Sequence, residues 1–477
     1  MKTLRPVHYL MLAILALSAY QPTLHLGFLW DDHVMIEANP HLRHWSRLEL
    51  RHDFTTDVFD GHGDPYYRPV QTLMNRVDYS LWGLHPLGYH LTNFLGHVGN
   101  TLMTVQLGLV LGLTPMGAFL AGSIVAVHPI VVEQLMIVAG RAEIFGLFLT
   151  LAALYFLLRP GRRAAALGIA CFVIALFLKE SAVAIPALLA LCFWFLRRPA
   201  RDYARLIPCA VLIIPYLAIR HAAVGPLGYP FDAAYIGKFF LIAFPHVVWT
   251  YVRLLIMPWN LHSHRLVPRL SHIWALYLIS WPLVVAGLWR ARSRWGLFVV
   301  GWLLICLLPK TPVMIFGNFM LDHWAYPALI GVAFWMGHLL HRAWTEQHRF
   351  WARVAIPLYL VFLVVWALFV HLNVALRGTD EKMYRWALNF TTSNPIRYNL
   401  GILLLQTGRP MEGAEYLELV HANYPDNVNA TYALALCFEA GGHPKAARFY
   451  LRQLHVAHPD FAPATDAPRR LQHTLKK

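Results

Sequence analysis

Two adjacent aspartates, Asp31 and Asp32, follow directly after the first long apolar run of the chain, which ends at Trp30. An ionisable pair at the edge of a bilayer is costly to place and therefore indicates a functional site. A carboxylate at this position could take a proton from a hydroxyl group and act as a general base. The alternative is that both aspartates are solvated loop residues, because acids at the interface cost much less than buried ones.

Three further segments place charged and aromatic side chains among apolar residues, and these segments are 66–97, 126–148 and 178–186. By the topology described below, Glu133, Arg141 and Lys179 lie on the same side of the membrane as Asp31. Four separate segments would then bring acids and cations together at one face. Topology signals alone do not explain such a convergence, which favours a functional site.

Composition indicates what kind of protein must position these side chains. Of the 477 residues, 58% are hydrophobic and 14% are charged. Long apolar runs recur near the roughly 20 residues that a helix needs to cross a bilayer. The net charge of +15 resides mostly in arginine clusters between these runs, which topology explains without a nucleic-acid partner. We therefore predict an all-α, polytopic membrane protein.

Four basic clusters set the orientation, because Lys and Arg accumulate on the cytoplasmic side. The clusters lie at 159–163, 197–205, 290–294 and 341–353. About eleven spans place all four in the cytoplasm, with the N-terminus inside and the C-terminus outside. The predicted spans are 7–29, 93–112, 115–133, 141–158, 164–178, 181–196, 206–220, 273–289, 295–308, 324–340 and 354–372. The segment 239–257 is predicted to lie at the outer interface. At this segment the number of spans could differ from eleven by one hairpin.

The tail after residue 372 contains an internal repeat. Leu400 recurs as Leu434 and Gly408 recurs as Gly442, an offset of 34 residues that is typical of a tetratricopeptide helix pair. The tail holds fewer repeats than an independent solenoid usually needs, so we expect them to pack on the membrane domain or on a partner. We predict a transmembrane catalytic domain at 1–372, with a large external loop at 31–89, and a C-terminal tetratricopeptide-repeat α-solenoid at 373–477.

The order of several short motifs carries a family resemblance. The motifs WDD, YYRP, GYHLTNFLGH, HPIVVEQ, GRAE and LKES precede the repeat tail. This order resembles the transmembrane-and-tetratricopeptide-repeat O-mannosyltransferases, which belong with the lipid-linked glycosyltransferases of the GT-C superfamily. The resemblance covers most of the chain, is strongest over 28–185, and implies a GT-C-like membrane fold. In the late segment 321–331, His323 stands where the family has an arginine.

The resemblance implies that an acid in the first external loop is the catalytic base, with Asp31 as the first candidate and Asp32 as the second. A polyprenyl phosphate is a good leaving group, so one carboxylate that deprotonates the acceptor hydroxyl is sufficient, with inversion at the anomeric carbon. Cations should face the departing phosphate. The candidates are Arg141, Lys179, Arg68 and His323.

The remaining candidates have structural alternatives. Arg141 and Lys179 could instead pair with Glu143 and Glu180, as buried membrane charges usually find partners. The candidates for binding or orienting the acceptor are Glu133, Glu143, Tyr67, His90 and Asn93. Tyr67 could equally be an interfacial anchor, and His90 and Asn93 share a helical face that is more typical of a polar seam than of a metal site. No metal ligand and no cofactor is assigned, and metal dependence is left open.

These observations predict a membrane glycosyltransferase that moves a sugar from a polyprenyl-phosphate carrier to a hydroxyl acceptor on the non-cytoplasmic face. The resemblance favours mannose and a protein Ser or Thr, and the repeats favour a protein acceptor or partner. The alternative is a non-enzymatic membrane scaffold whose repeats assemble an envelope complex and which needs no base. The excess of Arg over Lys indicates a bacterial inner membrane, with the repeats in the periplasm.

Overall fold

The computed structural model describes residues 4–61, 66–226, 232–267, 274–345, 349–459 and 461. Within this part of the chain the regular structure is helical, apart from the two-residue strands β1 (Arg265–Leu266) and β2 (Phe319–Met320). The predicted all-α class is therefore confirmed. The chain divides into two compact units, the first formed by 1–261 and 267–375 and the second by 262–266 and 376–477. This division lies close to the domain boundary predicted after residue 372.

In the described part of the chain, the first unit holds one α-helix in each of the eleven predicted spans. They are α1 (Pro6–Tyr20), α4 (Pro86–Val110), α5 (Pro115–Val127), α7 (Arg141–Leu157), α8 (Arg162–Leu178), α9 (Ile185–Phe195), α10 (Leu206–Val224), α13 (Trp274–Arg290), α14 (Arg294–Leu307), α16 (Tyr326–Thr345) and α17 (Arg349–Arg377). Among the described residues, six helical segments are long and apolar enough to cross a membrane, or seven if one bent pair counts as a single span. The other helices are shorter or carry buried polar residues, as α4 does.

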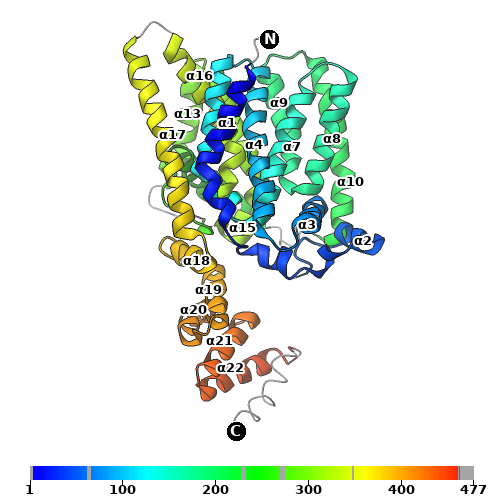
Figure 1. The fold of residues 1–477 in the computed structure, drawn as a ribbon, viewed down its shortest axis with the longest axis vertical. Helices are drawn as coiled ribbons and strands as arrows, with labels where there is room; N and C mark the ends of the chain where they lie inside the picture. The colour runs from blue at the N-terminus through cyan, green and yellow to red at the C-terminus, as the bar shows by residue number, and fades with distance from the viewer. Residues whose placement is uncertain are drawn as a thin grey trace. The chain divides into compact units, whose positions relative to one another are not determined.

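Shorter elements connect these helices. The α-helices among them are α2 (Arg47–Thr55), α3 (Pro69–Trp82), α6 (Val132–Met136), α11 (Ala233–Lys238), α12 (Phe244–Ile256) and α15 (Thr311–Gly317). The others are η1 (Gln21–His25), η2 (His33–Glu37), η3 (Pro40–Arg43), η4 (Pro129–Val131), η5 (Val138–Gly140), η6 (Glu180–Ala184), η7 (Ala200–Arg205), η8 (Phe239–Ala243), η9 (Leu308–Lys310) and η10 (Asp322–Ala325). Figure 1 shows α2 and α3 at the end of the first unit opposite the N-terminus, as the predicted external loop requires.

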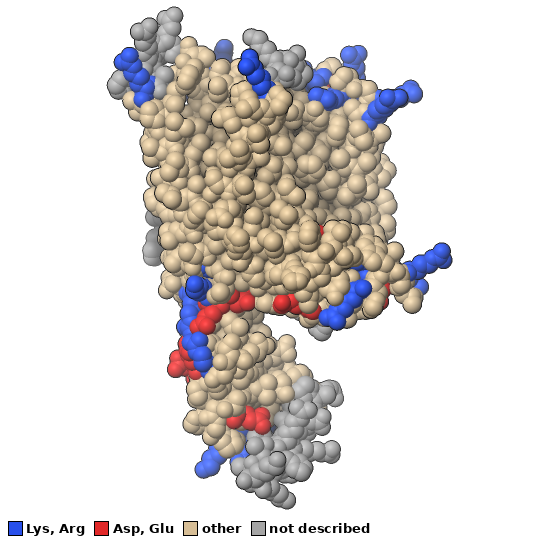
Figure 2. All heavy atoms as spheres, in the orientation of Figure 1, with Lys and Arg blue, Asp and Glu red and all other residues tan. Residues whose placement is uncertain are grey.

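The surface of the first unit has the charge distribution of a membrane protein. The side shown in Figure 2 carries a broad band that is nearly free of charged side chains, with Lys and Arg at one end and both acidic and basic residues at the other. Charged side chains are costly inside the hydrocarbon core, so such a band is the part that faces lipid. Together with the apolar helices, it defines a multi-pass membrane protein. Residues 346–348 of the basic cluster at 341–353 lie outside the described residues.

A break at His128 and Pro129 bends one predicted span. The helices on either side, Pro115–Val127 and Pro129–Met136, meet at 46°. Pro129 has no amide proton to continue the helical hydrogen bonds, and the amide of Ile130 donates instead to Nδ1 of His128 at 3.2 Å. The bend redirects the chain just before Glu133.

The segment Ala233–Ile256, built from α11, η8 and α12, is long and apolar enough to cross a membrane. At one end, the hydroxyl of Tyr235 donates to the carbonyl of Ile315 at 3.2 Å. At the other end, Nε2 of His128 donates to the carbonyl of Leu255 at 3.0 Å. Ile315 lies between the predicted spans 295–308 and 324–340, on the outer side, and His128 lies in the outer part of the predicted span 115–133. Both contacts favour the prediction that 239–257 lies at the outer interface, which stays a prediction.

The second unit consists of consecutive helices. They are α18 (Asp380–Leu388), α19 (Asn394–Gln406), α20 (Pro410–Asn423), α21 (Val428–Ala440) and α22 (Pro444–Ala457). The first helix of each pair begins at residue 394 or 428, and the second begins at residue 410 or 444, so both offsets are 34 residues. Gly408 and Gly442 adopt φ of 78° and 80° between the helices of their pairs, a conformation that favours glycine. The tetratricopeptide assignment stays a prediction that this spacing supports.

Candidate active site

The carboxylate of Asp32 is fully buried and accepts three backbone hydrogen bonds. Oδ2 accepts from the amides of Leu29 at 3.1 Å and Val138 at 2.9 Å, and Oδ1 accepts from Ala139 at 2.7 Å. Burial raises the pKa of Asp32 to about 7, while the amide donors favour the ionised form. Asp32 therefore ties the segment after α1 to η5, and its side chain has no surface open to an acceptor.

Asp31 differs from its neighbour because it is only partly buried. The chain reaches it through Trp30, whose φ of 52° lies in the left-handed region that non-glycine residues rarely adopt. This turn places the two adjacent carboxylates in different surroundings. The structure thus separates the pair into an anchoring residue, Asp32, and a more accessible one, Asp31.

The segment η5 is held from several sides. Besides the contacts with Asp32, the side chain of Gln71 in α3 donates to the carbonyl of Ala139 at 2.9 Å, and that of Asn93 in α4 donates to the carbonyl of Val138 at 3.0 Å. A Cβ atom on Gly140 would lie 2.6 Å from the carbonyl oxygen of Gln134, so only glycine fits there without a shift. These contacts fix the start of α7 and the charged residues on its first turn.

Glu143 on that first turn binds two lysines. Its Oε2 lies 2.6 Å from Nζ of Lys179 and its Oε1 lies 2.9 Å from Nζ of Lys310, and Lys310 also donates to the carbonyl of Trp324 at 3.0 Å. Burial lowers the pKa of Lys179 to about 8, although Glu143 opposes this effect. One carboxylate facing two ammonium groups leaves a formal charge of +1, so this cluster can accept a further anionic group.

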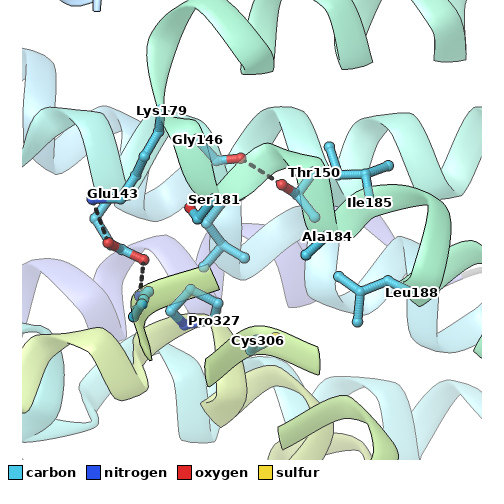
Figure 3. A pocket seen from close by; sticks show the side chains of 12 residues that line it. Glu143, Gly146, Thr150, Lys179, Ser181, Ala184, Ile185, Leu188, Cys306 and Pro327 are labelled. Carbon is cyan, nitrogen blue, oxygen red and sulfur yellow. Dashed lines mark hydrogen bonds and ion pairs between the residues drawn. The ribbon is translucent and has the colours of Figure 1, made fainter. Parts of the chain in front are cut away.

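A small cavity adjoins the cluster. Its volume is about 30 Å³, enough for roughly one water molecule. Its wall combines Glu143 and the two lysines with Thr150, Ser181 and apolar residues of α7, α9, α14 and η6, among them Leu147, Ile185, Leu188 and Cys306. Figure 3 shows the ion pairs of Glu143 at one end of this cavity and Leu188 at the other. The site therefore joins a cationic end to an aliphatic one.

The other predicted phosphate ligands are also paired with acids. Nη2 of Arg141 lies 2.6 Å from Oδ2 of Asp78, and both residues are buried. Arg68 pairs with Glu180 at 3.0 Å and stacks on the ring of Tyr66. The alternative prediction that Arg141 and Lys179 pair with acids was right, and Lys179 does pair with one of the two expected acids, Glu143. The expected partners of Arg141 and Glu180 were wrong. Arg141 binds Asp78, which the sequence analysis did not select, and Glu180 binds Arg68.

Glu133 and His323 form a further pair, with Nδ1 of His323 donating to Oε1 of Glu133 at 2.8 Å. His323 thus contacts the acid that follows the bend at Pro129. Glu133 belongs to α6 and His323 belongs to η10. The structure therefore brings the segment 321–331 next to the segment 126–148.

Tyr67, His90 and Asn93 serve the fold. Tyr67 is fully buried and donates to the carbonyl of Phe54 at 3.0 Å, so its ring is open to neither a sugar nor the membrane interface. His90 bonds the carbonyls of Gly27 at 3.2 Å and Leu135 at 3.1 Å. The structure does not support Tyr67 as an acceptor ligand, and it places His90 and Asn93 in hydrogen bonds between segments, as a polar seam would be.

Lys310 is the residue of this cluster that the sequence analysis missed. It lies in η9, directly after α14, in an apolar sequence that ends Leu-Leu-Pro-Lys. A lone cation at the outer end of a predicted span, on the same side as Lys179 and Asp31, is the signal that could have identified it.

The fold and the charge cluster together define a multi-pass, all-α membrane protein with a polar site at one end of its helices. Its sequence is similar to proteins named protein O-mannosyl-transferases, which confirms the predicted resemblance. Tmtc1 of Drosophila melanogaster is 35% identical over 133 residues, which are 27% of this chain and 16% of that protein. TMTC2 of Homo sapiens is 31% identical over 147 residues, 30% of this chain and 17% of that protein. F38B6.6 of Caenorhabditis elegans is 26% identical over 296 residues, 58% of this chain and 42% of that protein.

The chain thus spans less than half the length of each of these relatives. No protein-family model matches it. Among solved structures, an oligosaccharyltransferase of Archaeoglobus fulgidus tethered to an acceptor peptide aligns over 87% of this chain and 58% of its own, with 13% identity and a TM-score of 0.39.

Proposed function

We propose that this protein is a membrane glycosyltransferase that transfers a sugar, with mannose as the first candidate, from a polyprenyl-phosphate carrier to a hydroxyl group of a protein on the non-cytoplasmic face. The single observation that carries the proposal is the pair of lysines on Glu143 at the polar end of a cavity with aliphatic walls. A phosphate on a hydrocarbon tail has the same division into an anionic head and an apolar chain. Because the cavity holds only about one water molecule, the tail itself would lie outside it, in the bilayer. The names of the relatives support protein O-mannosylation.

In this proposal Asp31 is the general base. It takes the proton from the acceptor hydroxyl as the hydroxyl oxygen attacks the anomeric carbon from the face opposite the phosphate, and the configuration inverts. The bond between the anomeric carbon and the phosphate oxygen breaks, and its electron pair leaves with the carrier phosphate. Lys179 and Lys310 stabilise the charge that the phosphate gains. Arg68 and His323 are further candidates for binding the phosphate, and each is paired with an acid in the structure, Glu180 and Glu133. Asp32 positions Asp31 and η5.

The proposal is tested by measuring sugar transfer from labelled polyprenyl-phosphate sugars to envelope proteins with purified protein in detergent. We expect Asp31→Asn to lose transfer, because an amide cannot take the proton of the acceptor hydroxyl. Asp32→Asn should lower the melting temperature as well as the rate. If Asp31→Asn transfers sugar at the wild-type rate, Asp31 is not the base. If the wild type transfers no offered donor and both variants behave like it, the scaffold function becomes the better explanation.

The second unit supports a protein acceptor or partner, because stacked helix pairs with a 34-residue repeat commonly bind peptides and proteins. With the N-terminus in the cytoplasm, the same proposal places these helices in the periplasm of a bacterial inner-membrane protein. Deleting residues 376–477 should then reduce transfer to protein acceptors more than transfer to a short soluble acceptor.

A further inference from the structure

The external loop contains a cluster of histidines and acids away from the charge cluster around Glu143. Nε2 of His52 lies 3.1 Å from Oδ1 of Asp60, and Nε2 of His41 lies 3.5 Å from Oδ2 of the same carboxylate. The two imidazole rings stack, with their centroids 3.9 Å apart. One nitrogen from each ring and one oxygen of Asp60 all lie within 4.8 Å of one another. Three atoms of types that commonly bind metal ions therefore lie close together.

The two nitrogen–oxygen separations are close to those expected around a bound zinc ion. Zn²⁺ binds histidine nitrogen and carboxylate oxygen at about 2.0–2.2 Å in a tetrahedral arrangement, so neighbouring ligand atoms lie roughly 3.3–3.5 Å apart. The side chains of His41, His52 and Asp60 are 31%, 28% and 35% exposed. An ion can thus enter from solvent, and three protein ligands would leave a fourth position open.

Glu49 orients the ring of His41. Nδ1 of His41 donates to Oε2 of Glu49 at 2.8 Å, and the other ring nitrogen, Nε2, faces Asp60 at 3.5 Å from Oδ2. Metal-binding histidines characteristically donate their other nitrogen to a carboxylate in this way.

A buried arginine holds the segments that carry the ligands. Arg76 and Asp53 are both inaccessible and form an ion pair at 2.7 Å, so the residue next to His52 is fixed in place. Arg76 also donates to the backbone carbonyls of His41 and His44. The positions of η3 and α2 thus depend on one guanidinium group, and the ligands are held in place without the ion.

We propose that His41, His52 and Asp60 bind a divalent transition-metal ion, with Zn²⁺ as the best match, and that Glu49 positions His41. The ion joins η3, α2 and the turn at Asp60, and so closes the external loop between residues 41 and 60. Its fourth position is open to water or to a small anionic ligand. The proposal adds a metal site that the sequence analysis did not assign, and it does not depend on the transfer reaction.

The test measures zinc retained by the full-length protein, carrying no histidine tag, after stripping with a chelator, reloading with Zn²⁺ and gel filtration in detergent. We expect about one ion per chain in the wild type and in the control His44→Ala, which removes an exposed imidazole outside the cluster. His52→Ala and Asp60→Asn should each lose that ion. Glu49→Ala should weaken binding by about 10–100-fold in competition with a metal-sensitive dye, the usual effect of removing such a carboxylate.

Asp60→Asn keeps the size of a side chain that is one-third exposed, so it tests the ligand without removing buried structure. Its melting temperature should match that of the metal-stripped wild type, which shows that the variant is folded. Equal zinc retention by the wild type, His52→Ala and Asp60→Asn would overturn the proposal. So would a wild type that retains no zinc, because the histidines would then be held by Asp60 and Glu49 alone.

Discussion

Replacing Glu143 by glutamine would leave the ammonium groups of Lys179 and Lys310 buried without the carboxylate they share. In the structure they lie 2.6 and 2.9 Å from its two oxygens, and the side chains of Glu143 and Lys310 are only 2% and 5% exposed. Removing one partner of a buried ion pair costs about 3–5 kcal/mol, because the remaining charge is uncompensated. We expect Glu143→Gln to lose at least this much unfolding free energy, since two cations lose their counterion.

A second substitution separates this electrostatic effect from lost packing. Lys310→Met removes one cation and keeps an aliphatic chain of similar length, so Glu143 and Lys179 remain as a balanced pair. Replacing all members of a buried ion pair or triad by well-packed apolar side chains is often neutral, whereas removing one member is costly. Lys310→Met leaves Glu143 paired with Lys179 but frees the carbonyl of Trp324, so we expect it to cost less than Glu143→Gln. The double variant Glu143→Gln/Lys310→Met should be more stable than Glu143→Gln.

Thermal unfolding of the purified protein in detergent, followed by tryptophan fluorescence, measures these differences. The matched control is Glu381→Gln, which removes an acid that is one-third exposed and paired with Arg385 and Arg409; exposed pairs contribute only about 0–1 kcal/mol. The reasoning is refuted if Glu143→Gln has the same melting temperature as the wild type, or if the double variant has a lower melting temperature than Glu143→Gln. Either result would mean that Glu143 does not neutralise both lysines.

Three further predictions follow from the same region. Gly140→Ala should lower stability by about 1–3 kcal/mol, because its Cβ would overlap the Gln134 carbonyl, while Gly27→Ala, with open space around it, should melt like the wild type. Burial raises the pKa of Asp32 from 3.8 to about 7, so between these pH values the folded protein keeps a proton that the unfolded chain releases. The contribution of this proton to the free energy of unfolding is complete below pH 4 and is lost as the pH rises through 7. The melting temperature of the wild type should therefore fall relative to that of Asp32→Asn between pH 4 and 7. Because the pKa of Lys179 is lowered to about 8, the KM for the lipid-linked donor should rise above pH 8 in the wild type but not in Lys179→Arg, whose guanidinium stays charged.

The fold class followed from the sequence because lipid imposes strong local rules. Apolar runs had to be helices, and arginine clusters marked one face. The bend at His128 and Pro129 was not predicted, since 115–133 was expected to be one continuous span. Helix ends differed from the predicted spans because polar residues extend some helices beyond the apolar run, as in α4, which begins at Pro86 rather than at residue 93.

The site was less predictable because it depends on contacts between distant segments. The residue types and the shared face were predicted from local patterns, but the partner of each charge was not. Lys310 reaches Glu143 across 167 positions and Arg141 reaches Asp78 across 63. The different surroundings of Asp31 and Asp32 depend on amides more than 100 positions away, which no local pattern in WDD encodes.

The anchoring of Asp32 by η5 also constrains how the protein can be made. The carboxylate and the amides of Val138 and Ala139 are 106 and 107 positions apart. At a synthesis rate of about 5–20 residues per second, Asp32 leaves the ribosome roughly 5–20 s before those amides exist. During that interval the carboxylate cannot make the hydrogen bonds that bury it in the folded protein. The hydrogen bonds from Val138 and Ala139 to Asp32 can form only after the bent span and the start of α7 have been made. Assembly of the site therefore requires the first third of the chain to be present.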